Sequence, residues 1–295
     1  NNTWNTPYLF NAKELDEETG MYYYGARYYE PRLSLWMSAD PLEEKYPNIS
    51  SYIYCANNPI NAIDLHGDSI SITYKTGFLG FGGTKQLLYE KGKLYNSDGS
   101  PYLGKVKGYL ASVVQGLSDL GSTSEGASLI SELETSTNMF TIKKGDTNKF
   151  KADSPTKAGG NLSEIQTVTG NFSKSSGSGG IIYWNNNITT SGLDTNGNLD
   201  RPSYIGLGHE MAHASDASQG LLHYSNDYTN TNGTYTASYN GLKKAEWRAV
   251  YRENIIRSQA LLPLRAYYGY DISSGKPHPI GPRLLSPQNT PLIYP

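Results

Sequence analysis

Two histidines and a glutamate stand close together in the stretch YIGLGHEMAHASD, residues 204–216. His209 and His213 are four residues apart, and Glu210 follows the first histidine directly. On an α-helix this spacing places both imidazoles on one face, one turn apart, where both can reach a single Zn²⁺ ion. A carboxylate beside them can act as a general base toward a water molecule. The chain has only 5 histidines among 295 residues, so the HExxH pattern predicts a catalytic zinc helix rather than a chance match.

The residues around the motif indicate that this helix is buried. The run SYIGLG before it is mostly apolar, and the small residues Ala212, Ala214 and Ala217 follow. The alternative interpretation is a core helix whose histidines only satisfy internal hydrogen bonds. Burying two histidines and a glutamate without a metal is energetically unfavourable, so the composition of the helix favours the zinc interpretation.

A catalytic zinc site takes three protein ligands and keeps one position open, so a third ligand must come from elsewhere in the chain. The long helix predicted over residues 241–262 carries Glu246, which we expect to be that ligand. Glu253 lies two turns further along a similar face and remains an alternative metal ligand. The pattern HExxHxxGxxH requires a histidine where this chain has Gln219, so that arrangement is excluded. The other candidates are Asp216, His223 and His278.

Two further segments have residue types that suit a peptidase site. The sequence LPLRAYYGYD brings Arg265, Tyr267 and Tyr268 just after the ligand helix, and a guanidinium or phenol there could stabilise an oxyanion in the transition state. The spacing does not choose among the three. The predicted strand at residues 181–185 is either an ordinary core strand or an edge against which a substrate adds as a further strand.

Composition limits the classes of protein. The net charge of −2 gives no indication of a nucleic-acid or membrane-surface partner, and a single cysteine cannot form an internal disulfide. No apolar run is long enough to span a membrane, and the first ten residues do not resemble a signal peptide. Because the chain does not begin with methionine, we expect a fragment or a processed piece.

The pattern of elements predicts an α+β protein. Residues 1–67 are rich in tyrosine and turn residues, and they predict a β-rich segment that ends near Gly67. Residues 68–179 predict β-hairpins and two helices that lead, through a mobile surface loop at 151–179, into a catalytic region at 180–295 with an extended C-terminal tail. Strands are expected at 68–75, 138–144 and 179–187, a turn at 91–92, and helices at 104–120, 122–134, 202–220 and 241–262.

The first segment resembles the C-terminal end of an Rhs/YD-repeat core domain. The match covers residues 7–67 and includes PYLFNAKELDEETGMYYYGARYYEPRLSLWMSADPL and YPNISSYIYCANNPINAIDLHGD. The resemblance implies a role in packaging and delivering a C-terminal toxin inside a β-cage. Some members also cleave themselves with two aspartates, whose matching positions are Asp40 and Asp64. The family's DPxGL reads DLHGD here and lacks both the proline and the final leucine.

The catalytic region is similar to the NleD-like effector zinc metallopeptidases. The matching pieces, in order, are LGHEMAHASD, AEWRAVYRENIIR and LPLRAYYG. The resemblance implies zinc on His209 and His213, Glu210 as general base, and a third ligand on the AEWRAV helix, in agreement with Glu246.

These observations together predict an Rhs-type polymorphic toxin whose C-terminal domain is a zinc-dependent endopeptidase. Such a toxin is secreted or injected, cleaves a protein in a recipient cell, and implies a cognate immunity protein, the rest of an Rhs core and a secretion apparatus. One alternative is a zinc-dependent peptidoglycan hydrolase. The other is a non-catalytic, zinc-stabilised effector that binds a host protein, although a structural zinc site has no use for a base such as Glu210.

Overall fold

The computed structural model describes nine segments of the chain. They are residues 8–10, 13–23, 28–38, 70–76, 83–159, 176–222, 238–239, 242–272 and 275–293. Contacts divide the chain into two units, one made of residues 1–67 and 95–101 and the other of residues 68–94 and 102–295.

The first unit contains a five-stranded antiparallel sheet. Its strands follow chain order: β1 (Tyr8–Phe10), β2 (Lys13–Asp16), β3 (Met21–Tyr23), β4 (Tyr28–Glu30) and β5 (Leu35–Trp36). In the turn between β2 and β3, the Asp16 carboxylate accepts hydrogen bonds from the backbone N–H groups of Glu18 and Thr19. Gly20 closes this turn with a φ of 74°, a conformation that side chains with a Cβ disfavour. The buried rings of Tyr29 and Trp36 pack edge to face across β4 and β5.

The second unit is built on a six-stranded mixed sheet with the order β10-β11-β9-β6-β7-β8. Its strands are β6 (Ile70–Lys75), β7 (Thr84–Glu90), β8 (Lys93–Tyr95), β9 (Phe140–Lys144), β10 (Lys149–Ala152) and β11 (Gly180–Trp184). The predicted hairpin turn at Lys91 and Gly92 joins β7 to β8, and both residues have positive φ. The described part of the unit also has two short sheets, β12 (Ser238–Tyr239) with β13 (Leu242–Lys243) and β14 (Tyr267–Asp271) with β15 (His278–Arg283).

The strand β11 lies inside the sheet. It pairs in parallel with β9 on one side and antiparallel with β10 on the other. Both of its edges are therefore occupied by strands of the same chain. Of the two alternatives for residues 181–185, the core strand is confirmed and the edge for a substrate is wrong. Strand β10, which covers that edge, begins at residue 149 and was not predicted from the sequence.

The sheet also changes two of the predicted boundaries. Residues 151–159, expected to belong to a mobile loop, form the end of β10 and the short helix α3 (Pro155–Gly159). Residues 160–175 of the same predicted loop lie outside the described residues. Strand β11 follows the predicted division at residue 180, and both of its partners, β9 and β10, precede it. The two predicted regions on either side of residue 180 therefore belong to one unit, apart from residues 95–101.

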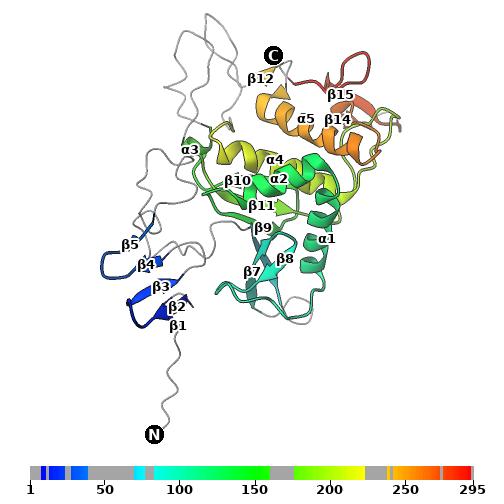
Figure 1. Cartoon of the computed structure of the whole chain (residues 1–295). Coiled ribbons are helices and arrows are strands. Elements are labelled where there is room, and N and C mark those ends of the chain that lie inside the picture. The colour runs from blue at the N-terminus through cyan, green and yellow to red at the C-terminus, as the bar shows by residue number, and fades with distance from the viewer. Residues whose placement is uncertain are drawn as a thin grey trace, which may run out of the picture. The chain divides into compact units, whose positions relative to one another are not determined.

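Four longer helices complete the second unit. They are α1 (Tyr109–Gly121), α2 (Ser124–Glu134), α4 (Ser203–Ser218) and α5 (Lys244–Gln259), close to the predicted ranges. Helix α4 packs on strands β10 and β11 and is covered on its other side by α5, with α1 and α2 beside it. Figure 1 shows this arrangement, with α4 in yellow between the green sheet and the orange α5. The HExxH helix is therefore the centre of the unit.

The central position of α4 explains its composition. All residues from Ile205 to Ala217 are buried, so the helix has no polar stripe of the kind that a surface helix shows. A Cβ on Gly208 would lie 2.8 Å from a methyl group of Leu120 on α1 and 3.1 Å from one of Ile256 on α5. A glycine directly before His209 thus lets the neighbouring helices approach the motif closely.

Arg252 on α5 forms ion pairs that link α5 to α2. Its guanidinium pairs with Glu125 and with both carboxylate oxygens of Glu132, and it also donates to Ser215 on α4. The Arg252 side chain is only 19% exposed. We expect Arg252→Met to lower the free energy of unfolding by about 1–3 kcal/mol, because it leaves two partly buried carboxylates without their cation.

Chemical denaturation of the full chain would measure this loss. Lys93→Met, the matched substitution at an exposed lysine on β8, should change the free energy of unfolding by no more than about 0.5 kcal/mol. Equal stability of the two variants would contradict the assigned role of Arg252.

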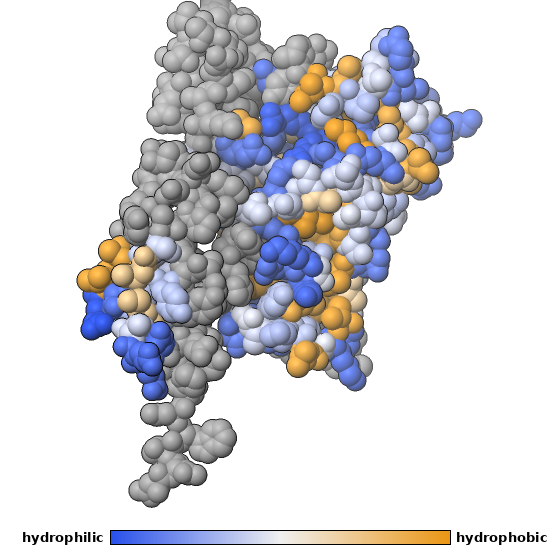
Figure 2. Space-filling model, viewed as in Figure 1, coloured by the Kyte–Doolittle hydropathy of each residue, from blue (hydrophilic) through white to orange (hydrophobic). Residues whose placement is uncertain are grey.

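The described surface has no single large apolar area on the face shown in Figure 2. There, hydrophobic residues occur in several separate groups between hydrophilic ones. Among the helices that the structure describes, none combines the length and the apolar character needed to cross a membrane.

Candidate metal centre

Helices α4 and α5 bring three metal-ligand side chains to one point. The donor atoms of His209, His213 and Glu246 all lie within 4.8 Å of one another. Oε2 of Glu246 is 3.2 Å from Nε2 of His209 and 3.3 Å from Nε2 of His213. Both histidines are buried, and the Glu246 side chain is 23% exposed. The structure therefore brings together the two histidines of the motif and the carboxylate that we expected as their third partner.

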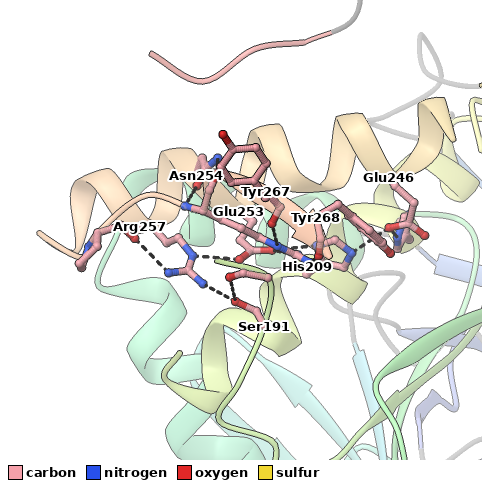
Figure 3. Close-up of polar contacts among 12 residues, drawn as sticks. Ser191, His209, Glu246, Glu253, Asn254, Arg257, Tyr267 and Tyr268 are labelled. Atoms are coloured by element: carbon pink, nitrogen blue, oxygen red, sulfur yellow. Dashed lines mark hydrogen bonds and ion pairs between the residues drawn. The ribbon is translucent and has the colours of Figure 1, made fainter. Parts of the chain in front are cut away.

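His209 lies between two carboxylates, which determine where its ring carries a proton and where it presents a lone pair. Its Nδ1 is 3.0 Å from Oε2 of Glu253, on the side of the ring away from Glu246. Figure 3 shows His209 with Glu253 on one side and Glu246 on the other. If Nδ1 donates its proton to Glu253, the neutral ring presents the lone pair of Nε2 to an oxygen of Glu246 that also has only lone pairs. A cation between these atoms removes the repulsion, so the donor set fits a zinc ion.

The ionisation of His209 and Glu246 supports the same conclusion. Burial by itself disfavours charge on His209, but hydrogen bonds to Glu246 and Glu253 outweigh it and raise its pKa to about 9. Burial likewise raises the pKa of Glu246, yet the neighbouring His213 and His209 hold it below its ordinary value. The site thus favours an anionic carboxylate opposite positive charge, whether a proton or a metal supplies that charge.

Glu210 lines a cavity beside the metal-ligand cluster. The cavity has a volume of about 440 Å³, and its walls include His209, Glu210, Arg201, Arg265 and Tyr268. The Glu210 side chain is buried, and burial raises the pKa of its carboxyl group. A raised pKa brings a carboxylate closer to the range in which it both accepts and returns a proton near neutral pH.

Glu253 has a different place from the one considered for it as an alternative ligand. It is fully buried and faces Nδ1 of His209, so it is outside the ligand cluster. Its carboxylate accepts hydrogen bonds from Nε of Arg257 at 2.9 Å and from Nη1 of Arg265 at 3.0 Å. These two cations hold its pKa well below the ordinary value, although burial alone would raise it. The sequence shows a glutamate on the right helix but cannot show which side of His209 it contacts.

The three candidates for oxyanion stabilisation are separated by the structure. Tyr268 lines the cavity, whereas Tyr267, its neighbour on β14, is not among the lining residues, because successive strand residues point to opposite faces. Burial and then the Glu246 charge raise the pKa of Tyr268, so its phenol keeps its proton. The N–H groups of Arg265 are directed to Glu253 and to the backbone oxygens of Tyr267 and Tyr268. Its guanidinium also lies 4.7 Å from the centre of the Tyr268 ring, so Arg265 positions that tyrosine.

The remaining candidates lie elsewhere or outside the described residues. Asp216 forms a two-fold ion pair with Arg248, with distances of 2.6 and 2.7 Å, and is not part of the ligand cluster. His278 is exposed on β15. His223, Asp40 and Asp64 fall in segments that the structure does not describe.

Glu253→Gln should weaken zinc binding without removing a ligand. The amide keeps the size of the carboxylate but loses the charge that orients His209 and neutralises Arg257 and Arg265. We expect the zinc affinity of the full chain to fall about 10–100-fold, as for other hydrogen-bond partners of metal-binding histidines. Competition with a chelating dye measures the change. Glu132→Gln, which also removes a glutamate that binds an arginine but lies on α2, is the matched control, and an equal loss in both variants would contradict a specific effect on His209.

The geometry defines a class of protein: a mixed α and β domain with a candidate metal centre beside a cavity that contains a buried carboxylate. Comparison with known families assigns the chain more closely. It belongs to the Peptidase_M91 family, described as effector protein, whose match covers residues 101–268, more than half of the chain. This match includes all three residues of the cluster and Glu210, and it confirms the expectation of an effector domain of peptidase type.

Several curated proteins share a shorter similarity with the chain. The tRNA(Glu)-specific nuclease WapA of Bacillus subtilis subsp. natto is 36% identical over 89 residues, which cover 29% of this chain and 4% of the nuclease. The toxin subunit YenC2 of Yersinia entomophaga is 41% identical over 58 residues, or 20% of this chain and 6% of the subunit. The chain therefore spans only a small part of the length of these relatives. No solved structure matches the chain.

Proposed function

We propose that the second unit is a zinc-dependent endopeptidase with His209, His213 and Glu246 as zinc ligands. The observation that carries the proposal is the convergence of two imidazole nitrogens on one carboxylate oxygen, at 3.2 and 3.3 Å. The family of effector peptidases to which the chain belongs supports the reaction class. When bound, zinc would polarise a peptide carbonyl and acidify a water molecule beside it.

Three side chains of the protein have the other roles in the proposed reaction. Glu210 takes a proton from the attacking water and later returns it to the amine that leaves, for which its raised pKa suits it. The protonated phenol of Tyr268 donates a hydrogen bond to the oxygen of the peptide group as negative charge develops there. Glu253, held by Arg257 and Arg265, keeps His209 in one orientation and one tautomer.

We further propose that the enzyme is the toxic part of an Rhs-type effector. The relatives named as nucleases and as a toxin subunit share only a short segment with this chain, which suits a delivery segment joined to different effector domains. The resemblance of residues 7–67 to an Rhs core agrees with this arrangement. On this proposal the chain reaches a recipient cell through a secretion apparatus, and the producing cell makes an immunity protein. Self-cleavage by Asp40 and Asp64 is part of the same hypothesis.

Identification of new protein N-termini would test the proposed activity. The full chain and Glu210→Ala are added to bacterial and to eukaryotic lysates, and N-termini produced only by the wild type are identified by mass spectrometry. The proposal predicts a small set of sites that require Glu210. Release of peptides from purified peptidoglycan, with no cleaved protein, would favour a wall hydrolase. No Glu210-dependent product in any sample, with zinc bound, would favour the non-catalytic binding effector.

A further inference from the structure

Arg201 is a buried cation for which the described residues provide no direct counter-charge. It stands just before helix α4, and its side chain lines the cavity that also contains His209 and Glu210. The residue is 8% exposed. Its backbone N–H donates to the carbonyl of Thr189, but its buried Nε has no hydrogen-bond acceptor in the part of the chain that the structure describes.

In the described part of the chain, the two neighbouring arginines form ion pairs and Arg201 does not. Arg265 and Arg257 share the carboxylate of Glu253. The charges of Glu253 and Glu210 reach Arg201, but neither carboxylate forms an ion pair with it among the described contacts. Buried charges are usually paired because an unpaired charge loses its hydration without compensation. The cavity wall at Arg201 is therefore short of an anion.

Asn148 adds a second donor at the same place. Its side-chain oxygen accepts a hydrogen bond from the backbone N–H of Asn185, whereas its buried Nδ2 has no acceptor among the described residues. Asn148 also lines the cavity. A Cβ added to Gly206 would lie 2.5 Å from Nδ2 of Asn148 and 2.9 Å from an Nη atom of Arg201. Both donors thus pack against the bare backbone of Gly206, where any side chain would displace them.

We infer that Arg201 and Asn148 form a binding site for the carboxylate of an aspartate or glutamate side chain of the substrate. A carboxylate matches the fork of a guanidinium and supplies the full negative charge that a backbone carbonyl lacks. The inference rests on the proposed function, which it deepens by naming a substrate class. Because the site shares one cavity with His209 and Glu210, the acidic side chain lies close to the bond that is cleaved. Arg201 then determines specificity without taking part in proton transfer.

Binding of a small probe tests the site without requiring any cleavage. The probes are N-acetyl-aspartate N-methylamide and the corresponding asparagine compound, titrated at constant ionic strength into the zinc-loaded full chain. The unfolding midpoint temperature is followed in each titration. We expect the wild type to bind the aspartate probe about 30-fold more tightly, as for loss of one partner of a buried charged pair. In Arg201→Met this preference should disappear.

Two further variants complete the design. Arg201→Lys keeps the charge and should retain part of the preference for aspartate. Gly206→Ala should weaken the preference for aspartate, because its methyl group displaces both donors. If Arg201→Met does not fold, Gly206→Ala takes its place in the comparison. An aspartate preference that persists in Arg201→Met, as it would if the carboxylate bound the metal, overturns the inference. So does the lack of any preference in the wild type.

The outcome is independent of the test of peptidase activity. An aspartate preference that depends on Arg201 in a chain without Glu210-dependent cleavage would keep the anion site and reject the proposed function. Glu210-dependent cleavage without that preference would keep the function and reject the anion site.

Discussion

Glu210→Gln should lower the rate of peptide-bond cleavage by at least about 100-fold while zinc binding is unchanged. Glutamine has nearly the shape of glutamate, so the buried side chain can keep its place in the cavity wall. It cannot accept the proton of the attacking water, because an amide is not basic near neutral pH. Since Glu210 is not one of the three clustered donors, the substitution leaves the proposed zinc ligands intact.

Two measurements on the same purified protein separate these effects. Cleavage is followed on the protein substrate that N-terminal mapping identifies, and zinc is measured by atomic absorption, with about one ion per chain expected for both proteins. Glu17→Gln, the same substitution in an exposed turn of the first unit, serves as the control and should cleave at the wild-type rate. A Glu210→Gln protein that keeps full activity would show that another group removes the proton.

Glu246→Ala should differ from Glu210→Gln in losing zinc binding as well as activity. The substitution removes the oxygen that lies near both histidines and leaves only two protein ligands. If the ligands share a binding free energy of roughly 10 kcal/mol, losing one of three weakens zinc binding by about 100–1000-fold. Cleavage should fall at least as far when free zinc is kept low.

Titration of the zinc-free chain against a chelator of known affinity provides the measurement. Adding excess zinc should restore metal to Glu246→Ala but restore cleavage only in part, because a site with two protein ligands no longer fixes the geometry around the metal. The result also separates the two glutamates on α5. If Glu253→Gln loses more zinc affinity than Glu246→Ala, then Glu253 rather than Glu246 is the ligand.

The local sequence was sufficient to predict the two helices, α4 and α5, that hold the candidate metal ligands. The spacing of His209 and His213 follows from the period of a helix, and the apolar residues around them predicted a buried one, which α4 is. The length and charge of the segment around Glu246 predicted the second helix, α5. These predictions succeeded because periodicity and turn residues act over a few positions of the chain.

The sequence favoured Glu246 as the third ligand but could not exclude Glu253, because seven residues return a helix to nearly the same face. The packing of α5 on α4 gives the two glutamates different neighbours. Glu246, in the first turn of α5, lies beside Nε2 of both histidines, whereas Glu253, two turns later, lies beside Nδ1 of His209. Arg265 then binds Glu253 from β14, which follows α5 after Pro263.

Tertiary structure alone also decided what surrounds the cluster. Strand β10, which the sequence analysis did not predict, pairs with β11 and so removes the edge that the sequence suggested for a substrate. Arg201 stands just before α4, where no sequence pattern marks it, and the lack of an acceptor for its Nε among the described residues is seen only in the folded chain. The sequence by itself thus predicted, through local spacing, the helix that carries both histidines and the zinc ion proposed for it. The place of Glu246 beside both histidines, the contact of Glu253 with His209 and the lack of an acceptor for Nε of Arg201 among the described residues depend on contacts between segments far apart in the chain, which local spacing does not encode.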